Sequence, residues 1–191
     1  MKKIIIIAAA LLAGFAANAQ NIWLTGAFTQ ETSTSKVGNV KADTGKENGF
    51  WAGIEYDFNI NDWFTIAPSF TVNGLFSKED ITKSNYFGVD IPVFFRGTYY
   101  INSDFGIFAQ VAPAFNIGLF DNVTVGSADP VDILGDSYKR CGVYAIAGAG
   151  VQIKNAFRIF ANYDFALTDY SPVDNIHYGS KGFSVGIAFG F

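Results

Sequence analysis

Large apolar residues alternate with small or polar residues along most of the chain, with a period of two. The same alternation runs through residues 105–117 and 157–167 and is clearest at the C-terminus. A period of two is the pattern of a β-strand that presents two different faces. In the C-terminal stretch one face carries Phe183, Val185, Ile187, Phe189 and Phe191, and the other carries glycine, serine and alanine.

The alternation predicts eight strands whose connections alternate in length. Short turns at one rim and long polar loops at the other are typical of bacterial outer-membrane barrels, and an even strand number returns both termini to the short-turn rim. The predicted strands are residues 22–30, 48–58, 63–75, 84–100, 105–117, 138–153, 156–167 and 181–191. The predicted tight turns are 59–62, 101–104 and 154–155, and the long loops are 30–47, 77–83, 118–137 and 168–180.

Aromatic residues gather at both ends of these strands. Amphipathic rings settle at the two interfaces of a bilayer, so the pattern predicts two aromatic girdles. The girdle at the short-turn rim is expected to contain Trp23, Tyr56, Phe58, Trp63, Phe64, Tyr99, Tyr100, Phe105, Phe157, Phe189 and Phe191. The girdle at the long-loop rim is expected to contain Phe28, Phe50, Trp51, Phe76, Tyr86, Phe87, Phe115, Phe165 and Phe183.

Three prolines fall inside predicted strands: Pro68, Pro92 and Pro113. A closed barrel has no edge strand that could accommodate a residue without an N–H group. We therefore expect a bulge or a local break at each of them.

The first residues have the features of a secretory signal peptide. Lys2 and Lys3 precede a short apolar run, residues 4–15, and small residues flank Asn18 at the expected cleavage site. The apolar run is shorter than the roughly 20 residues that a membrane-spanning helix needs. We therefore expect a signal peptide at residues 1–19 and a barrel domain at residues 20–191.

Charge and cysteine content exclude several classes of protein. Removing Lys2 and Lys3 from the 13 basic residues leaves 11 against 17 acidic ones, a net charge of −6, so nucleic acid is not an expected partner. Cys141 is the only cysteine, which excludes an internal disulfide. We expect Cys141 to be an inert strand residue.

Charged residues on the inward faces suggest a plug. Glu55, Asp57, Arg96 and Arg158 all lie within about five residues of the short-turn ends of their strands, and Asp90 and Asp164 lie higher. The interior of an eight-stranded barrel is just wide enough to be filled by side chains. Buried charges need partners, so we expect these groups to form a structural cluster without catalytic chemistry.

Catalytic, cofactor and metal sites are not expected. His177 is the only histidine and falls in a predicted loop beside Asp174 and Ser180, whereas a Ser–His–acid site needs a rigidly held histidine. One histidine and one cysteine make a poor transition-metal site. The acidic loop 118–137 could recruit divalent cations that bridge lipopolysaccharide, but it lacks EF-hand spacing, so a solvated loop is the default.

Three stretches resemble the outer-membrane β-barrel domain family, which includes OmpX-like and PorT-like proteins. They are YFGVDIPVFF at residues 86–95, GAGVQI at 148–153 with the strand that ends YDFALT at 163–168, and the terminal strand that ends in Phe191. The resemblance implies an all-β, eight-stranded antiparallel up-and-down transmembrane barrel in the bacterial outer membrane, with both termini in the periplasm. It further implies contact with outer-membrane lipid and lipopolysaccharide. Pro92 would be a family feature, and Phe191 would be the assembly signal read by the barrel-assembly machinery.

These observations favour a non-enzymatic barrel that serves envelope integrity or surface contact through its long loops. Two alternatives remain open. One is a lipid-modifying outer-membrane enzyme. The other is a soluble periplasmic barrel that binds a small apolar ligand, which would require the large apolar faces to point inward. The sequence does not identify a surface ligand.

Overall fold

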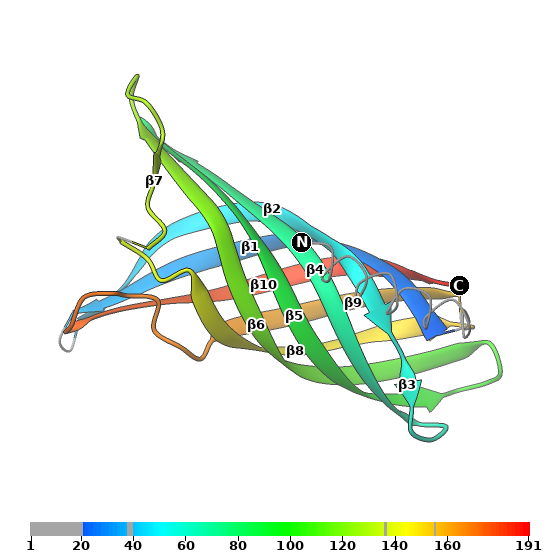
Figure 1. Cartoon of the computed structure of the whole chain (residues 1–191). Helices are drawn as coiled ribbons and strands as arrows, with labels where there is room; N and C mark the ends of the chain where they lie inside the picture. Colours follow the sequence, from blue (N-terminus) through cyan, green and yellow to red (C-terminus); the bar gives the residue numbers. More distant parts are fainter. Residues whose placement is uncertain (1–20, 38–39, 136, 155) are drawn as a thin grey trace, which may run out of the picture.

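The chain folds into a single β-barrel whose strands wrap obliquely around one axis (Figure 1). The structure is a computed structural model and describes residues 21–37, 40–135, 137–154 and 156–191. The predicted signal peptide at residues 1–19 lies outside the described residues. Within the described part, no helix is both long and apolar enough to cross a membrane.

Eight long antiparallel strands form a closed ring, as the sequence predicts. Each long strand pairs with the next one along the chain, and β1 pairs with β10 to close the ring. The short strands β3 (Phe58–Asn59) and β7 (Val131–Asp132) pair with β4 and β6. The long strands are β1 (Ile22–Val37), β2 (Val40–Tyr56), β4 (Phe64–Glu79), β5 (Thr82–Tyr100), β6 (Phe105–Val125), β8 (Cys141–Ile153), β9 (Phe157–Ala166) and β10 (Ile176–Gly190).

The large apolar residues point outward and the small or polar residues point inward. In β10, Val185 is 49% exposed, whereas its neighbours Ser184 and Gly186 are buried on the lumen side. The alternation is the same in β6 and β9. A soluble barrel with an apolar interior needs the opposite orientation, so the structure contradicts that alternative.

Three aromatic residues predicted for the girdles lie inside the barrel instead. Trp23 is 2% exposed, and Trp51 and Tyr86 line the lumen. Each belongs by period two to the inward face of its strand; Trp23, for example, shares a face with the buried Thr25. Strand parity, rather than distance from the rim, therefore decides where these rings lie.

The strands are longer than the hydrophobic pattern predicts, and two of the four predicted long loops are mostly strand. β1 and β2 continue through most of residues 30–47, β4 and β5 through most of 77–83, and β6 to Val125. The extensions of β1, β2, β4 and β5 are mostly polar on both faces, so they carry no hydrophobic period, whereas the extension of β6 keeps exposed apolar residues such as Leu119 and Val125. The backbone hydrogen bonds of these extensions to the neighbouring strand continue all the same, because the ladder does not depend on side-chain polarity.

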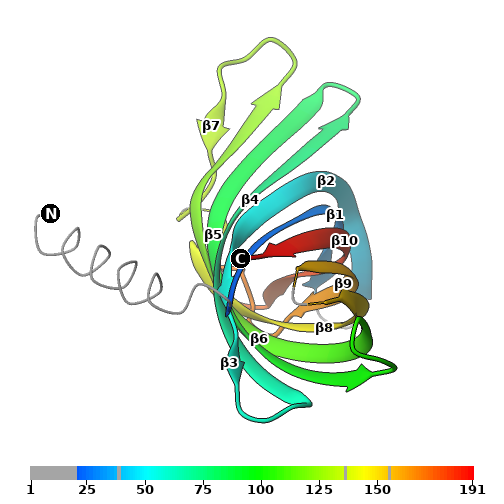
Figure 2. The same ribbon diagram turned by 90° about the vertical axis from the view of Figure 1, so that its right-hand side faces the viewer.

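Beyond the barrel rim the extended strands separate into two blades (Figures 1 and 2). β2 pairs with β4 only as far as Asn48 and Phe76, and β6 pairs with β8 only as far as Ile117 and Cys141. The first blade is therefore formed by the ends of β1, β2 and β10. The second is formed by the ends of β4, β5 and β6 together with β7.

The opposite rim has short connections, and both described chain ends lie there. The turns at residues 60–63 and 101–104 agree with the predicted ones. The third predicted turn falls between the end of β8 at Ile153 and the start of β9 at Phe157, and its residue 155 lies outside the described residues. Trp23 near the start of β1 pairs with Gly190 at the end of β10, and Figure 1 shows the C-terminus at the same end as these turns.

The prolines interrupt strand pairing without shifting its register. Pairing between β4 and β5 lapses between Pro68 and Thr71, and pairing between β5 and β6 lapses between Pro92 and Phe95, a gap that includes Pro113 on β6. A residue without an N–H group cannot donate to the ladder. The expected disruptions are therefore local breaks, and the two register shifts occur elsewhere in the sheet.

A charge on the outward face should destabilise the barrel in a bilayer. Val185→Arg places a guanidinium on the apolar belt halfway along the barrel part of β10, and we expect a loss of about 2–4 kcal/mol in the free energy of unfolding. Val37→Arg, near the tip of the first blade, is the control and should cost at most about 1 kcal/mol. Urea unfolding in lipid vesicles measures both, and equal losses would show that the belt does not face lipid.

Candidate functional site

Four charged side chains meet inside the barrel near the short-turn rim. Glu55 is on β2, Asp57 follows β2, Arg96 is on β5 and Arg158 is on β9. Each lies on the inward face of its strand, and each is only 3–5% exposed. The chain thus brings together four of the six charged residues that the sequence places in the lumen. We call these four residues the charge network.

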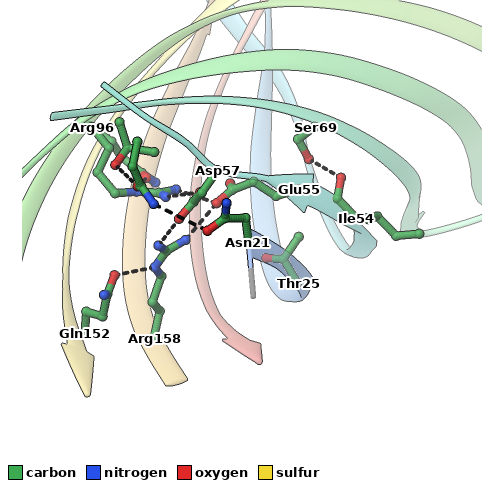
Figure 3. Close-up of polar contacts among 12 residues, drawn as sticks. Asn21, Thr25, Ile54, Glu55, Asp57, Ser69, Arg96, Gln152 and Arg158 are labelled. Atoms are coloured by element: carbon green, nitrogen blue, oxygen red, sulfur yellow. Dashed lines mark hydrogen bonds and ion pairs between the residues drawn. The ribbon is translucent and has the colours of Figure 1, made fainter. Parts of the chain in front are cut away.

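In the charge network each guanidinium bridges both carboxylates (Figure 3). Arg96 places Nη2 2.8 Å from Glu55 Oε1 and Nη1 3.1 Å from Asp57 Oδ1. Arg158 places Nη1 2.8 Å from Glu55 Oε1 and Nη2 2.5 Å from Asp57 Oδ2. An arginine with both of its donors on one carboxylate would connect only two strands. Here each arginine contacts both carboxylates, so the network connects three walls of the lumen. The two positive and two negative charges make it neutral overall.

Two side-chain amides accept hydrogen bonds from the Nε–H groups of the arginines, and an aromatic ring packs against one guanidinium. Arg96 Nε donates to Gln110 Oε1 at 3.0 Å, and Arg158 Nε donates to Gln152 Oε1 at 2.8 Å. The ring of Trp23 lies 3.5 Å from Arg158 Cζ, a cation–π contact. Sequence reasoning did not include these partners, although each amide directly pairs across strands with its arginine.

Aromatic rings cover the charge network on the side facing the middle of the barrel. Phe108 and Phe160 are buried beside Trp23, and Trp51 stacks on Phe160 with ring centroids 5.7 Å apart. The space left between the network and these rings is about 10 Å³. That volume is about what one water molecule requires, so side chains fill this section of the lumen.

Asp90 and Asp164 are not part of the charge network. Both line a cavity of about 420 Å³ in the part of the lumen nearer the blades. Asp90 accepts hydrogen bonds from the side-chain amides of Asn116, at 2.6 Å, and Asn73. The structure therefore divides the predicted inward charges into a neutral group near the short-turn rim and two acids in the cavity.

The histidine lies at the start of β10, not in a loop as predicted, and the acid that contacts its ring is not Asp174. His177 Nδ1 lies 2.5 Å from Asp169 Oδ2 in the β9–β10 connection, and the ion pairs of the described residues do not include Asp174. Ser180 is the strand partner of Ser33 on β1. No serine or threonine hydroxyl hydrogen-bonds to His177 in the part of the chain that the structure describes.

Two further features singled out in the sequence are Cys141 and the acidic segment 118–137. Cys141 is exposed at the start of β8. In the acidic segment 118–137, Asp132 pairs with Arg140 at 3.2 Å. The described residues contain no group of three histidine, cysteine or acidic side chains arranged to hold a metal ion. Cation binding by this segment stays a prediction.

Comparisons with known proteins identify the family and the fold. The family model described as "Outer membrane protein beta-barrel domain" matches residues 6–191. The solved structure of Neisserial surface protein A is similar, with 13% identity, a TM-score of 0.51 and coverage of 89% of this chain and 97% of that one. The outer membrane enzyme PagL shows 10% identity, a TM-score of 0.52 and coverage of 85% and 99%. No curated protein sequence matches the chain.

Removal of one arginine from the charge network should strongly destabilise the barrel. Arg158→Ala leaves two buried carboxylates facing a single guanidinium, and we expect a loss of about 3–5 kcal/mol in the free energy of unfolding. Lys181→Ala is the control, because Lys181 forms a solvent-exposed ion pair with Asp43 at 3.2 Å whose loss should cost at most about 1 kcal/mol. Unfolding of both variants in the same lipid would measure the difference, and equal stabilities would contradict burial of the network.

The connection between β9 and β10 should be sensitive to strong acid. Burial favours the neutral form of Asp169, but the backbone N–H of Ser171, the His177 ring and the N–H of Tyr178 outweigh it and lower the pKa of Asp169 to about 2. The contribution of the carboxylate to loop order is therefore complete above about pH 4 and lost as the pH falls through about 2. NMR titration should show this midpoint, and it should rise in His177→Gln. An unchanged midpoint would exclude the histidine as a cause.

Proposed function

The chain belongs to the outer membrane protein β-barrel domain family, and we propose that it is a non-enzymatic integral outer-membrane protein with a closed lumen. The observation that carries the proposal is the charge network. Four buried charged groups from three strands and the residue after β2 neutralise one another across the full width of the barrel. Solute transport through the centre would have to break these contacts.

The packing above the network supports closure as well. Trp51, Phe108 and Phe160 form an aromatic layer over the arginines, and the remaining gap is about 10 Å³. A conducting pore needs a continuous water-filled path. The section of the lumen at the charge network is filled by side chains, and it interrupts any such path.

We propose that the short-turn rim faces the periplasm and that the two blades face the outside of the cell. Long connections of outer-membrane barrels lie on the extracellular side and short turns on the periplasmic side. The blades, built of hydrogen-bonded strands, would then form a surface suited to contact with other molecules. Phe191, whose N–H donates to the carbonyl of Ile22 at 2.9 Å, would present the terminal aromatic to the barrel-assembly machinery on the periplasmic side.

A lipid-modifying enzyme is the second candidate, and the His177–Asp169 contact favours it. An acid that holds a histidine ring is one part of a nucleophilic site. The missing part is a nucleophile, because no hydroxyl reaches the ring among the residues that the structure describes. Loss of a lipid-hydrolysing activity in His177→Gln would make the enzyme the better proposal.

The reconstituted protein should not conduct ions through a stable pore. In planar bilayers we expect no stable conductance steps from the wild type, because the charge network and its aromatic cover close the lumen. Insertion must be verified on the same sample, for instance by the heat-dependent shift of a folded barrel on electrophoresis. Regular porin-like steps from inserted protein would contradict a closed lumen.

A further inference from the structure

The cavity above the charge network contains acids that form no ion pair with any basic side chain of the described residues. We call it the vestibule; it has a volume of about 420 Å³ and its walls include Glu31, Asp90 and Asp164. The ion pairs of the described residues include none of these three carboxylates. The vestibule therefore differs from the charge network, in which the two acids match two arginines.

Two of these carboxylates lie side by side over a glycine. Glu31 on β1 and Asp164 on β9 are the strand partners of Gly182 on either side of it. A Cβ atom at Gly182 would lie 2.9 Å from Glu31 Cγ and 2.7 Å from Asp164 Oδ2. Both acidic side chains thus occupy the space that the missing Cβ leaves, and their charges repel each other at short range.

The two basic residues that line the vestibule, Lys139 and Arg140, contact groups at its rim. Arg140 donates to the carbonyl oxygens of Leu119 and Leu134 and pairs with Asp132. Lys139 Nζ donates to the carbonyl oxygen of Asp169 at 3.2 Å. Neither cation reaches down to the carboxylates, so the vestibule lacks a counter-charge of its own.

A buried acceptor without a donor lies in the same wall. Asn73 Oδ1 is buried and accepts no hydrogen bond, whereas the amide nitrogen of the same side chain donates to Asp90. That donation fixes the orientation of the amide, because the oxygen cannot face the carboxylate instead. The oxygen is closed off from the cavity, so its partial negative charge adds to the acidic character of this wall without being a contact for a ligand.

The remaining walls suit an organic cation better than a metal ion. Tyr86, Tyr144, Tyr170 and Trp51 line the vestibule, and aromatic faces attract ammonium groups and pack against methylene chains. The described acids are not grouped as metal ligands, and the volume lies in the range of small-molecule sites. Carboxylates distributed among aromatic rings match amino groups separated by aliphatic segments.

We propose that the vestibule binds a small linear polyamine, with ammonium groups at Glu31, Asp164 and Asp90. The methylene segments would lie against the tyrosine rings and Trp51. This binding goes beyond the proposed function and needs only the vestibule itself, so it does not depend on which rim faces the outside.

Calorimetric titration of the purified full-length barrel in nonionic detergent with spermidine tests the proposal. We expect saturable binding to the wild type and an affinity at least tenfold lower in both Glu31→Gln and Asp164→Asn. Asp104→Asn is the matched control: it removes one negative charge at the exposed short-turn rim and should leave the affinity unchanged. The heat-dependent electrophoretic shift verifies that each variant is folded.

Three results would overturn the proposal. The first is no saturable binding to the wild type. The second is an equal loss of affinity in Asp104→Asn, which would indicate attraction by net charge alone. The third is displacement of spermidine by an equal concentration of Mg²⁺, which would indicate a site for divalent ions. If Glu31→Gln does not fold, Asp164→Asn decides the matter, because Asp164 forms no ion pair within the described structure whose loss could unfold the barrel.

Discussion

Charges buried in the interior of a narrow barrel have to be neutralised within it, and the rest of this structure depends on that constraint. Closing eight strands into a ring leaves a lumen that is only a few side chains wide. Glu55 and Asp57 enter it from one wall, and Arg96 and Arg158 reach them from two others. Because each guanidinium contacts both carboxylates, the network joins β2, β5 and β9, strands that are not neighbours in the sheet.

The lumen has two electrostatic halves, and the difference between them determines what each can do. The half near the short-turn rim is neutral, packed and covered by aromatic rings, which suits a structural closure. The half near the blades is hollow and carries carboxylates without cationic partners. The vestibule lies above the filled section at the charge network. A cation could therefore enter from the blade side and be retained by the carboxylates. The polar blades around the mouth are long, hydrogen-bonded strands, which makes them stiffer than ordinary loops.

Much of this arrangement follows from the alternation of residues, because strand parity decides which way a side chain points. Parity alone places Arg96 and Arg158 in the lumen, and the distance from the turns places them at one level. Parity does not show which groups meet, since that depends on the stagger of the strands. The bridging of both acids by each arginine, and the roles of Gln110 and Gln152, therefore appear only in the structure. Hydrophobic patterning also misses the extensions of β1 and β2, whose two faces are both mostly polar. It cannot trace the loop path that brings Asp169 to His177.

The most direct test of the account is the coupling free energy between Arg158 and Asp57. It is obtained from the unfolding of wild type, Arg158→Met, Asp57→Asn and the double variant in one lipid composition. If the pair is buried and mutually dependent, each single variant is strongly destabilised, and the double variant recovers much of the loss because it is again neutral. Single losses that simply add, within about 0.5 kcal/mol, would contradict the account and would mean that the lumen is open to water at this level.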